Sequence, residues 1–251
     1  MVRRDVLDHG YVDFIESWGS DARIIEAARM STDKGFQGWG PTHSKRCQDT
    51  TRDDFLDGCV CDCTTPGDEK LLRYLWTHKH LTPFEMAGMT IEIQAPIFVV
   101  REWHRHRTQS YNELSARYTA LPDLYYIPSV ERLMAGKQAK GNKQSSEYGF
   151  TENEASLLRI DFIEAVARAR SVYERLLNRG VSRELSRLVI PVTQYTRFRA
   201  SANLRNWLGF LALRLDAGAQ WEIRIYATAV HDILSKLFPR TIGLFNEDLE
   251  N

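Results

Sequence analysis

The sequence lacks any long apolar run. Its apolar stretches, such as residues 95–100, fall far short of the roughly 20 residues that a membrane helix requires. The first residues are charged and amphipathic, without the apolar core of about 7–15 residues that marks a signal peptide. We therefore expect no membrane partner and a location in the cytoplasm, or in the host cytoplasm if the source is viral.

Cysteine is almost absent. The only four cysteines lie in one short stretch, at Cys47, Cys59, Cys61 and Cys63. A secreted disulfide framework spreads its cysteines along the chain, so we expect reduced thiols. With His43 upstream, the cluster also admits a zinc site, but the one-residue gaps fit a tetrahedral metal poorly. We assign no metal ligand, and metal analysis of the purified protein distinguishes the two interpretations.

An excess of charge of one sign is also absent, because 33 Lys and Arg balance 33 Asp and Glu. A general nucleic-acid binder needs a sustained positive field, so we expect no nucleic acid partner. Lysine is scarce, at 8 residues against 25 arginines. Arginine binds phosphates and carboxylates with a planar charged fork, so the excess favours recognition of a defined anion. An arginine-favouring genome would produce the same skew.

The composition is that of an ordinary globular protein, with 43% hydrophobic and 26% charged residues in 251. No internal repeat or linker divides the chain, so we predict a single domain over 1–251. Residues 33–66 are rich in Gly, Asp, Thr and Cys without helical periodicity, which predicts an irregular insertion. A second polar loop is expected around 136–144.

Helices dominate the remaining pattern, with a minority of strand, which predicts an α+β fold. Met89, Ile91 and Ile93 alternate with polar residues, as in a half-buried strand that Pro96 ends. We expect a second extended stretch over 117–127. Apolar periodicity and capping residues predict helices at 22–30, 68–78, from 97, 151–178, 183–190, 203–215 and 219–238.

The densest polar cluster is 101–118. On a continuous helix Arg105 and Arg107 would point in nearly opposite directions, so we expect the helix from 97 to end near them. If the chain is extended from Glu113 to Arg117, then Glu113, Ser115 and Arg117 share one face. That face would offer an acceptor, a hydroxyl and a guanidinium, which suit a sugar and a phosphate. The alternative is an exposed basic turn.

Within this cluster, Arg105, His106 and Arg107, followed after seven residues by Ser115, resemble the R-H-R-x7-S signature of the flavin-dependent thymidylate synthases. The resemblance continues through Tyr118. Further blocks similar to the family lie at 78–85, 95–99, 126–128, 187–191, 195–198, 203–205, 213–214 and 219–223. Only the 33–66 insertion and the 136–150 loop look foreign to the family.

The resemblance implies a single α+β domain with helices packed around a small, mainly antiparallel sheet. It implies synthesis of dTMP from dUMP, with 5,10-methylenetetrahydrofolate as carbon donor, FAD as hydride source and NADPH to recharge the flavin. It also implies a homotetramer with active sites between subunits. The other known route to C5 methylation starts with a cysteine thiolate, and no cysteine lies near the polar cluster. Ser115 could replace the thiolate only if a base activated it, and the resemblance implies hydride attack without an enzymic nucleophile, so we assign Ser115 to substrate binding.

The resemblance also implies site residues. Arg214 corresponds to the residue thought to favour ionisation of the uracil imide. Residues expected at dUMP are Glu102, Trp103, His104, Arg105, Glu113, Leu114, Ser115, Ala116, Arg117 and Arg187. Residues expected at FAD are His80, Thr82, Arg105, His106, Arg107, Glu113, Asn203, Leu204 and Arg205, with His80 near the isoalloxazine. Asn203 is also interpretable as a helix N-cap.

Three positions depart from the family pattern. Glu102 stands where Gln is common, and its carboxylate would be unfavourable beside a phosphate unless it faces the base or ribose. Gly209 and Gly218 replace side chains that contact flavin in some relatives, so either FAD binds more weakly or the insertion supplies those contacts. An RNA-binding protein that uses the arginines and aromatics of 98–126 and 183–224 is the alternative, and it predicts salt-dependent binding without a chromophore.

Overall fold

The computed structural model describes residues 3–40, 42–43, 64–65, 67–141 and 146–250. Among these residues no helix is long and apolar enough to cross a membrane. The same residues contain no group of three His, Cys, Asp or Glu side chains that could hold a metal ion. The four cysteines lie outside the described residues, so the choice between thiols and zinc stays with the metal analysis.

The chain divides into two compact units, each built from separate segments. The first comprises Met1–Glu16, Thr90–Ala202 and Gly209–Ile233, and the second comprises Ser17–Met89, Asn203–Leu208 and Leu234–Asn251. The prediction of a single domain stays a prediction. The predicted fold class is confirmed, since helices pack on a small sheet with antiparallel strand pairs.

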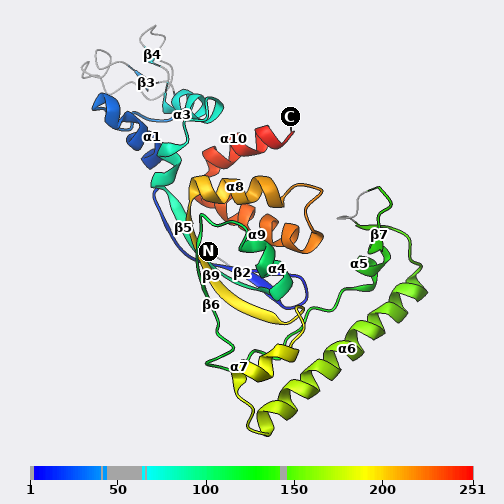
Figure 1. The fold of residues 1–251 in the computed structure, drawn as a ribbon. Coiled ribbons are helices and arrows are strands. Elements are labelled where there is room, and N and C mark those ends of the chain that lie inside the picture. Colours follow the sequence, from blue (N-terminus) through cyan, green and yellow to red (C-terminus); the bar gives the residue numbers. More distant parts are fainter. Residues whose placement is uncertain (1–2, 41, 44–63, 66, 142–145, 251) are drawn as a thin grey trace. The chain divides into compact units, whose positions relative to one another are not determined.

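A five-stranded sheet is the framework of the fold (Figure 1). Its strands follow the order β1 (Arg4–Val6), β2 (Gly10–Trp18), β5 (Gly88–Pro96), β9 (Tyr195–Asn203) and β6 (Ser110–Glu113). β1 pairs antiparallel with β2, and β6 pairs antiparallel with β9. Met89, Ile91 and Ile93 are completely buried on β5, which confirms the strand predicted from their alternation.

The helices of the first unit cover the sheet through an aromatic core. They include α4 (Ile97–Trp103), the C-terminal part of α8 (Leu204–Arg214) and most of α9 (Trp221–Leu237). The ring of Trp103 stacks on Phe210 with centroids 4.5 Å apart and meets Phe198 and Tyr226 edge-on. These contacts fix the end of α4, from which the arginine-rich turn leaves.

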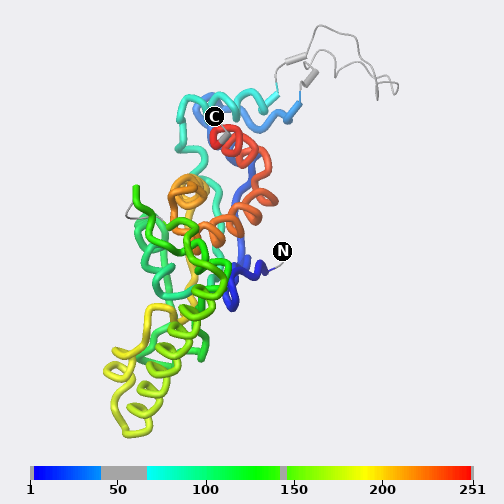
Figure 2. Tube along the Cα trace, turned by 90° about the vertical axis from the view of Figure 1, so that its right-hand side faces the viewer, coloured from blue at the N-terminus to red at the C-terminus, as the bar shows by residue number. Residues whose placement is uncertain are grey.

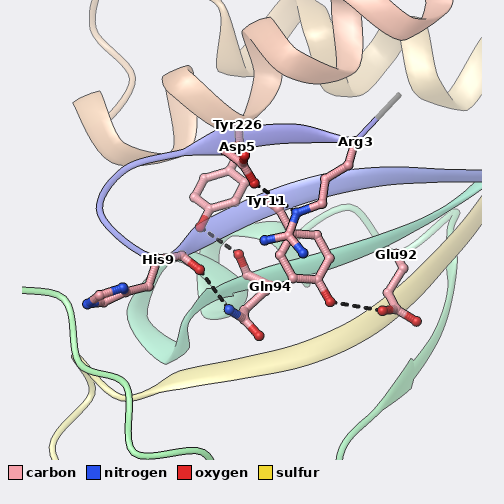
Figure 3. Close-up of polar contacts among 7 residues, drawn as sticks. All are labelled: Arg3, Asp5, His9, Tyr11, Glu92, Gln94 and Tyr226. Atoms are coloured by element: carbon pink, nitrogen blue, oxygen red, sulfur yellow. Dashed lines mark hydrogen bonds and ion pairs between the residues drawn. The ribbon is translucent and has the colours of Figure 1, made fainter. Parts of the chain in front are cut away.

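The β1–β2 hairpin is held to β5 by polar contacts, which Figure 3 shows. Tyr11 Oη donates to Glu92 at 2.9 Å, and Gln94 Nε2 donates to the carbonyl of His9 at 2.7 Å. Tyr226, on α9, donates to the Gln94 carbonyl at 2.7 Å. A Cβ at Gly10 would lie 2.0 Å from the Tyr226 hydroxyl oxygen, so glycine is required at this close approach.

A peripheral group of helices completes the first unit. It contains α5 (Val130–Met134), α6 (Glu152–Asn178), α7 (Arg183–Ser186), the 3-10 turn η3 (Arg187–Val189) and the hairpin of β7 (Lys137–Gln138) with β8 (Ser146–Glu147). A capping box between Thr151 and Glu154 starts α6. α6 packs against α7 and η3, as Figure 2 shows from the side.

The second unit is mainly helical. Its elements are α1 (Asp21–Arg29), η1 (Met30–Thr32), α3 (Asp68–Thr77), η2 (Thr82–Met86), α10 (Pro239–Glu250) and the short pair β3 (Thr42–His43) and β4 (Thr64–Thr65). Trp76 packs edge-on against Phe84 and Phe245. The buried Asp68 carboxylate accepts from Arg29 and from the Gln37 N–H, and so joins the two flanks of the 33–66 segment.

The predicted helices are confirmed, with small shifts at their ends. Several elements were not predicted, among them β1, β2, β6, β9, α5 and α10. The prediction that 117–127 is extended holds only near its end: residues 116–118 form a turn, whereas Tyr125 bridges Gln194 and the N–H of Tyr126 donates to the Thr193 carbonyl at 2.9 Å.

Candidate functional site

The arginine-rich motif forms a tight turn directly after α4. The N–H of Arg105 donates to the Glu102 carbonyl at 3.2 Å, and the N–H of His106 donates to the Trp103 carbonyl at 3.0 Å. Tyr111 Oη secures the turn by donating to the His106 carbonyl at 2.7 Å. The helix therefore ends where the sequence predicted.

The motif side chains divide between surface and interior. Arg105 and Arg107 are exposed, and neither has an ion pair within the part of the chain that the structure describes. Trp103 is completely buried in the aromatic core, so its side chain does not reach a ligand site. His104 lies against Tyr111, with ring centroids 4.6 Å apart, and its buried Nε2 has no hydrogen-bond partner in the described structure.

A first cavity, of about 360 Å³, collects five of the residues predicted at dUMP. Glu113, Leu114, Ser115, Ala116 and Arg187 line it, together with Ile97, Leu121, Ile190 and Thr196. Thr196 Oγ1 donates to Glu113 Oε1 at 2.8 Å and so orients that carboxylate. The cavity thus combines a carboxylate, a hydroxyl and a guanidinium with an apolar wall.

The segment after Glu113 is not extended, so the prediction of a shared strand face is wrong. β6 ends at Glu113, and a turn follows in which the N–H of Tyr118 donates to the Ser115 carbonyl at 3.0 Å. Ser115 Oγ accepts the N–H of Arg117 at 3.3 Å, a local bond that competes with strand pairing. As a result Arg117 lies outside the cavity, exposed, 3.6 Å from Glu184.

A second cavity, of about 700 Å³, contains Arg214 and Glu102. Arg214 is held in three ways: Nε donates to His106 Nε2 at 2.9 Å, Nη1 to Glu102 Oε2 at 3.1 Å, and Nη2 to the Glu102 carbonyl at 3.3 Å. The carboxylate of Glu102, which stands where Gln is common in the family, therefore faces the guanidinium of Arg214. Its negative charge is paired and does not have to lie beside a phosphate. Among the described lining residues none is common to both cavities.

His106 is kept neutral by its surroundings. Burial, together with the positive charge of Arg214, lowers the pKa of His106 from 6.5 to about 4. A neutral imidazole with its proton on Nδ1 leaves Nε2 as an acceptor, as the bond from Arg214 requires. His106 thus orients Arg214 without adding a second positive charge.

This pKa shift predicts an acid-sensitive fold. An unfolded histidine titrates near 6.5, so between that pH and about 4 the unfolded chain binds the extra proton. Neutral His106 therefore makes its full contribution to the free energy of unfolding above pH 6.5, and that contribution decreases as the pH falls toward about 4. Urea unfolding at pH 7 and at pH 4.5 measures the free energy of unfolding. We expect this free energy to fall less between the two pH values in His106→Gln than in the parent. In the control, the exposed His9 is replaced by Gln, and the free energy of unfolding should fall between pH 7 and pH 4.5 as much as in the parent. An equally large fall in His106→Gln would show that neutral His106 is not the source of the acid sensitivity.

The remaining predicted cofactor residues lie in the second unit. His80 and Thr82 are exposed, and His80 lies 5.8 Å from the Tyr74 ring. Arg205 pairs with Glu85, a residue of η2, so Arg205 and Thr82 belong to neighbouring elements. Leu204 is completely buried, and its N–H donates to the Ala87 carbonyl at 2.7 Å. Asn203 accepts the N–H of Asn206 at 3.0 Å, the geometry of a helix N-cap.

Comparison with known proteins establishes the family. The family model described as thymidylate synthase complementing protein matches residues 13–240. The chain belongs to the flavin-dependent thymidylate synthases. It is 39% identical to the flavin-dependent thymidylate synthase of Thermus thermophilus over 245 residues, covering 97% of this chain and 78% of that protein. The enzyme of Wolbachia pipientis is 36% identical over 242 residues, covering 96% and 75%.

A solved structure agrees with this assignment. The UMP/dUMP methylase PolB from Streptomyces cacaoi, bound with 5-Br dUMP, is 32% identical and covers 96% of each chain with a TM-score of 0.75. Membership of the flavin-dependent thymidylate synthases implies a flavin cofactor and confirms the family suggested by the R-H-R-x7-S motif.

Several residues that line the two cavities of this flavin-dependent thymidylate synthase were not predicted from the sequence. Thr196 carries no motif signal beyond its place in a block similar to the family. Arg132, Trp221 and Arg224 line the second cavity, although only Trp221 lies in a block that the resemblance covers. Their convergence depends on the contacts that Arg132 of α5 makes with Trp221 and Glu222 at the start of α9, which no local pattern reveals.

Proposed function

We propose that this flavin-dependent thymidylate synthase converts dUMP to dTMP in the cytoplasm, with 5,10-methylenetetrahydrofolate as carbon donor and NADPH as reductant. The observation that carries the proposal is the first cavity, where Glu113, Ser115 and Arg187 converge.

The first cavity suits a nucleotide monophosphate. Arg187 offers a fork for phosphate and has no ion pair among the described residues, so its charge is available. Ser115 and Glu113 provide a hydroxyl and an acceptor for sugar hydroxyls. The apolar side chains of Ile97 and Ile190 supply a wall for the ribose or base.

Arg214 would act on the uracil ring. A partly buried guanidinium beside the imide stabilises the negative charge that develops when N3 ionises, an effect worth about 3 kcal/mol in comparable sites. The bonds to Glu102 and His106 fix the guanidinium before substrate binds, so little reorganisation is needed.

The described residues fit FAD. Arg105 and Arg107 are neighbouring exposed guanidinium groups without acidic partners among the described residues, as a pyrophosphate site requires. The unpartnered buried Nε2 of His104 leaves a further polar group on the same turn. When bound, the flavin supplies the hydride that completes the methyl group. The residues themselves hold the dinucleotide and position the pyrimidine.

The hydrogen bond between Thr196 and Glu113 predicts a modest loss of affinity when it is removed. Thr196→Val should weaken dUMP binding about fivefold, because a single net hydrogen bond contributes about 1 kcal/mol. Calorimetric titration with dUMP measures the change. Thr193→Val is the matched control, since the Thr193 hydroxyl has no hydrogen-bond partner in the described structure. Equal affinity of the Thr196 variant and the parent would contradict the role given to Glu113.

Self-association into a homotetramer is part of the proposal. The predicted dUMP residues fall into two cavities without a shared lining residue, which favours sites completed by another subunit. Exposed apolar side chains on α6 and near η3 favour the same conclusion: Leu157, Ile160, Ile163, Leu185 and Leu188. Sedimentation analysis tests this, and a monomer at micromolar concentration would contradict it.

A spectrum followed by a product assay tests the function. The purified protein should be yellow, should oxidise NADPH faster when dUMP is added, and should form dTMP when methylenetetrahydrofolate is present. UMP is assayed beside dUMP because PolB is described as a methylase of both. A colourless protein that neither binds added FAD nor consumes NADPH would refute the proposal.

A further inference from the structure

The second cavity extends beyond Arg214 to three side chains that the proposed function does not use: Arg132, Trp221 and Arg224. We propose that they form a subsite for an aromatic group that carries an anion, on a co-substrate of the reaction. The inference rests on the proposed function, which supplies two such groups. These are the p-aminobenzoylglutamate portion of the folate and the 2′-phosphoadenosine portion of NADPH.

Arg132 is fixed in place before any ligand arrives. Its Nε donates to Glu222 Oε1 at 2.8 Å, and Glu222 is buried and also accepts from Tyr126 at 3.2 Å. Its Nη1 donates to Ser146 Oγ at 3.4 Å. A guanidinium held on two sides loses little conformational entropy when it binds an anion.

Trp221 lies beside this guanidinium, with the Arg132 Cζ 5.6 Å from the indole ring centroid. Trp221 begins α9, so the positive end of that helix faces the same cavity. An indole next to a fixed guanidinium suits a ligand whose aromatic ring is joined to an anionic group.

The charge of the subsite favours an anion. Arg214 is paired with Glu102 and Arg132 with Glu222, whereas Arg224 has no acidic partner in the described part of the chain. Three guanidinium groups against two carboxylates leave one positive charge. Arg224 Nη1 donates to the Ala217 carbonyl at 3.1 Å, which turns the guanidinium along the cavity wall. A cavity of about 700 Å³ has room for such a group next to the pyrimidine.

The paired strands β7 and β8 complete one side of the subsite. Gln138 of β7 and Ser146 of β8 line the cavity. The hydrogen bond from Arg132 Nη1 to Ser146 Oγ connects β8 to the guanidinium, so β8 helps to hold Arg132 in the subsite.

Binding of two probe molecules to the FAD-loaded protein tests the inference. The probes are p-aminobenzoyl-L-glutamate and 2′,5′-ADP, titrated by calorimetry into the parent and into Arg224→Gln, whose amide can still donate to Ala217. We expect at least tenfold weaker binding of one probe to the variant, while dUMP binding changes less than twofold. The affected probe identifies the co-substrate. Arg168→Gln, which removes an exposed guanidinium from α6, should bind both probes like the parent.

A second variant separates ligand binding from folding. Trp221→Leu should weaken the same probe, with an unchanged flavin spectrum and melting temperature, and should raise KM for the matching co-substrate. The inference is overturned if the parent binds neither probe at millimolar concentration, or if both variants bind both probes within twofold of the parent. In either case dTMP formation by the parent would leave the proposed function standing, and its absence would refute that function separately.

Discussion

Replacing Arg214 by alanine is expected to lower dTMP formation at least about a hundredfold while FAD stays bound, since removal of one charge-stabilising donor costs about 10²–10³ in turnover. Arg214 lines the second cavity and donates to His106 and Glu102, whereas the pyrophosphate is assigned to the exposed guanidinium groups of Arg105 and Arg107. The guanidinium would stabilise the ionised imide, and alanine leaves that charge without a counterpart.

The rate of dTMP formation and the flavin absorption spectrum, measured on the same preparation, check this expectation. Lysine at position 214 keeps the positive charge but cannot reproduce the three bonds to His106 and Glu102. We therefore expect Arg214→Lys to recover only part of the activity. Near-normal turnover of Arg214→Ala would show that the role assigned to Arg214 is wrong.

Replacing Arg187 by alanine is expected to weaken dUMP binding about 10–100-fold, because hydrogen bonds to charged groups contribute about 1.5–3 kcal/mol. Arg187 lines the first cavity together with Ser115, and its guanidinium would bind the phosphate of a nucleotide there. The effect should fall on dUMP affinity rather than on turnover, since Arg187 and Arg214 line different cavities, which share no lining residue among those that the structure describes.

Arg183 provides the matched control for this variant. It lies one helical turn earlier, is exposed, and does not line the cavity. Arg183→Ala should change dUMP affinity less than threefold, so the pair separates a specific phosphate contact from a general loss of positive charge. If the two variants lose affinity equally, the first cavity is not the phosphate site.

Local patterns in the sequence predicted the helices and the central strand well. The alternation around Ile91 identified β5, and the incompatible directions of Arg105 and Arg107 identified the end of α4. β9 carried a similar signal, because Phe198 and Ala200 are buried between exposed Arg197 and Arg199, but it was not used. Pro239 follows the end of α9 and is itself the first residue of α10, because proline is favoured at the first helical position.

The site was predictable as a list of residues and not as an arrangement. The motif placed Glu113 and Ser115 together, but the Ser115 hydroxyl turns the chain and removes Arg117 from the cavity. The division of the dUMP residues between two cavities depends on tertiary packing. So does the pairing of Glu102 with Arg214, which local spacing could not indicate over 112 positions.

We propose that dTMP synthesis by this enzyme depends on a flavin and on no cysteine nucleophile. The rate of dTMP formation by a variant with all four cysteines replaced by serine, measured with and without FAD, tests it most directly. We expect the variant to form dTMP at a rate close to the parent's with FAD, and to form none without it. Formation of dTMP without FAD, or loss of the product in a variant that still binds FAD, would contradict the account.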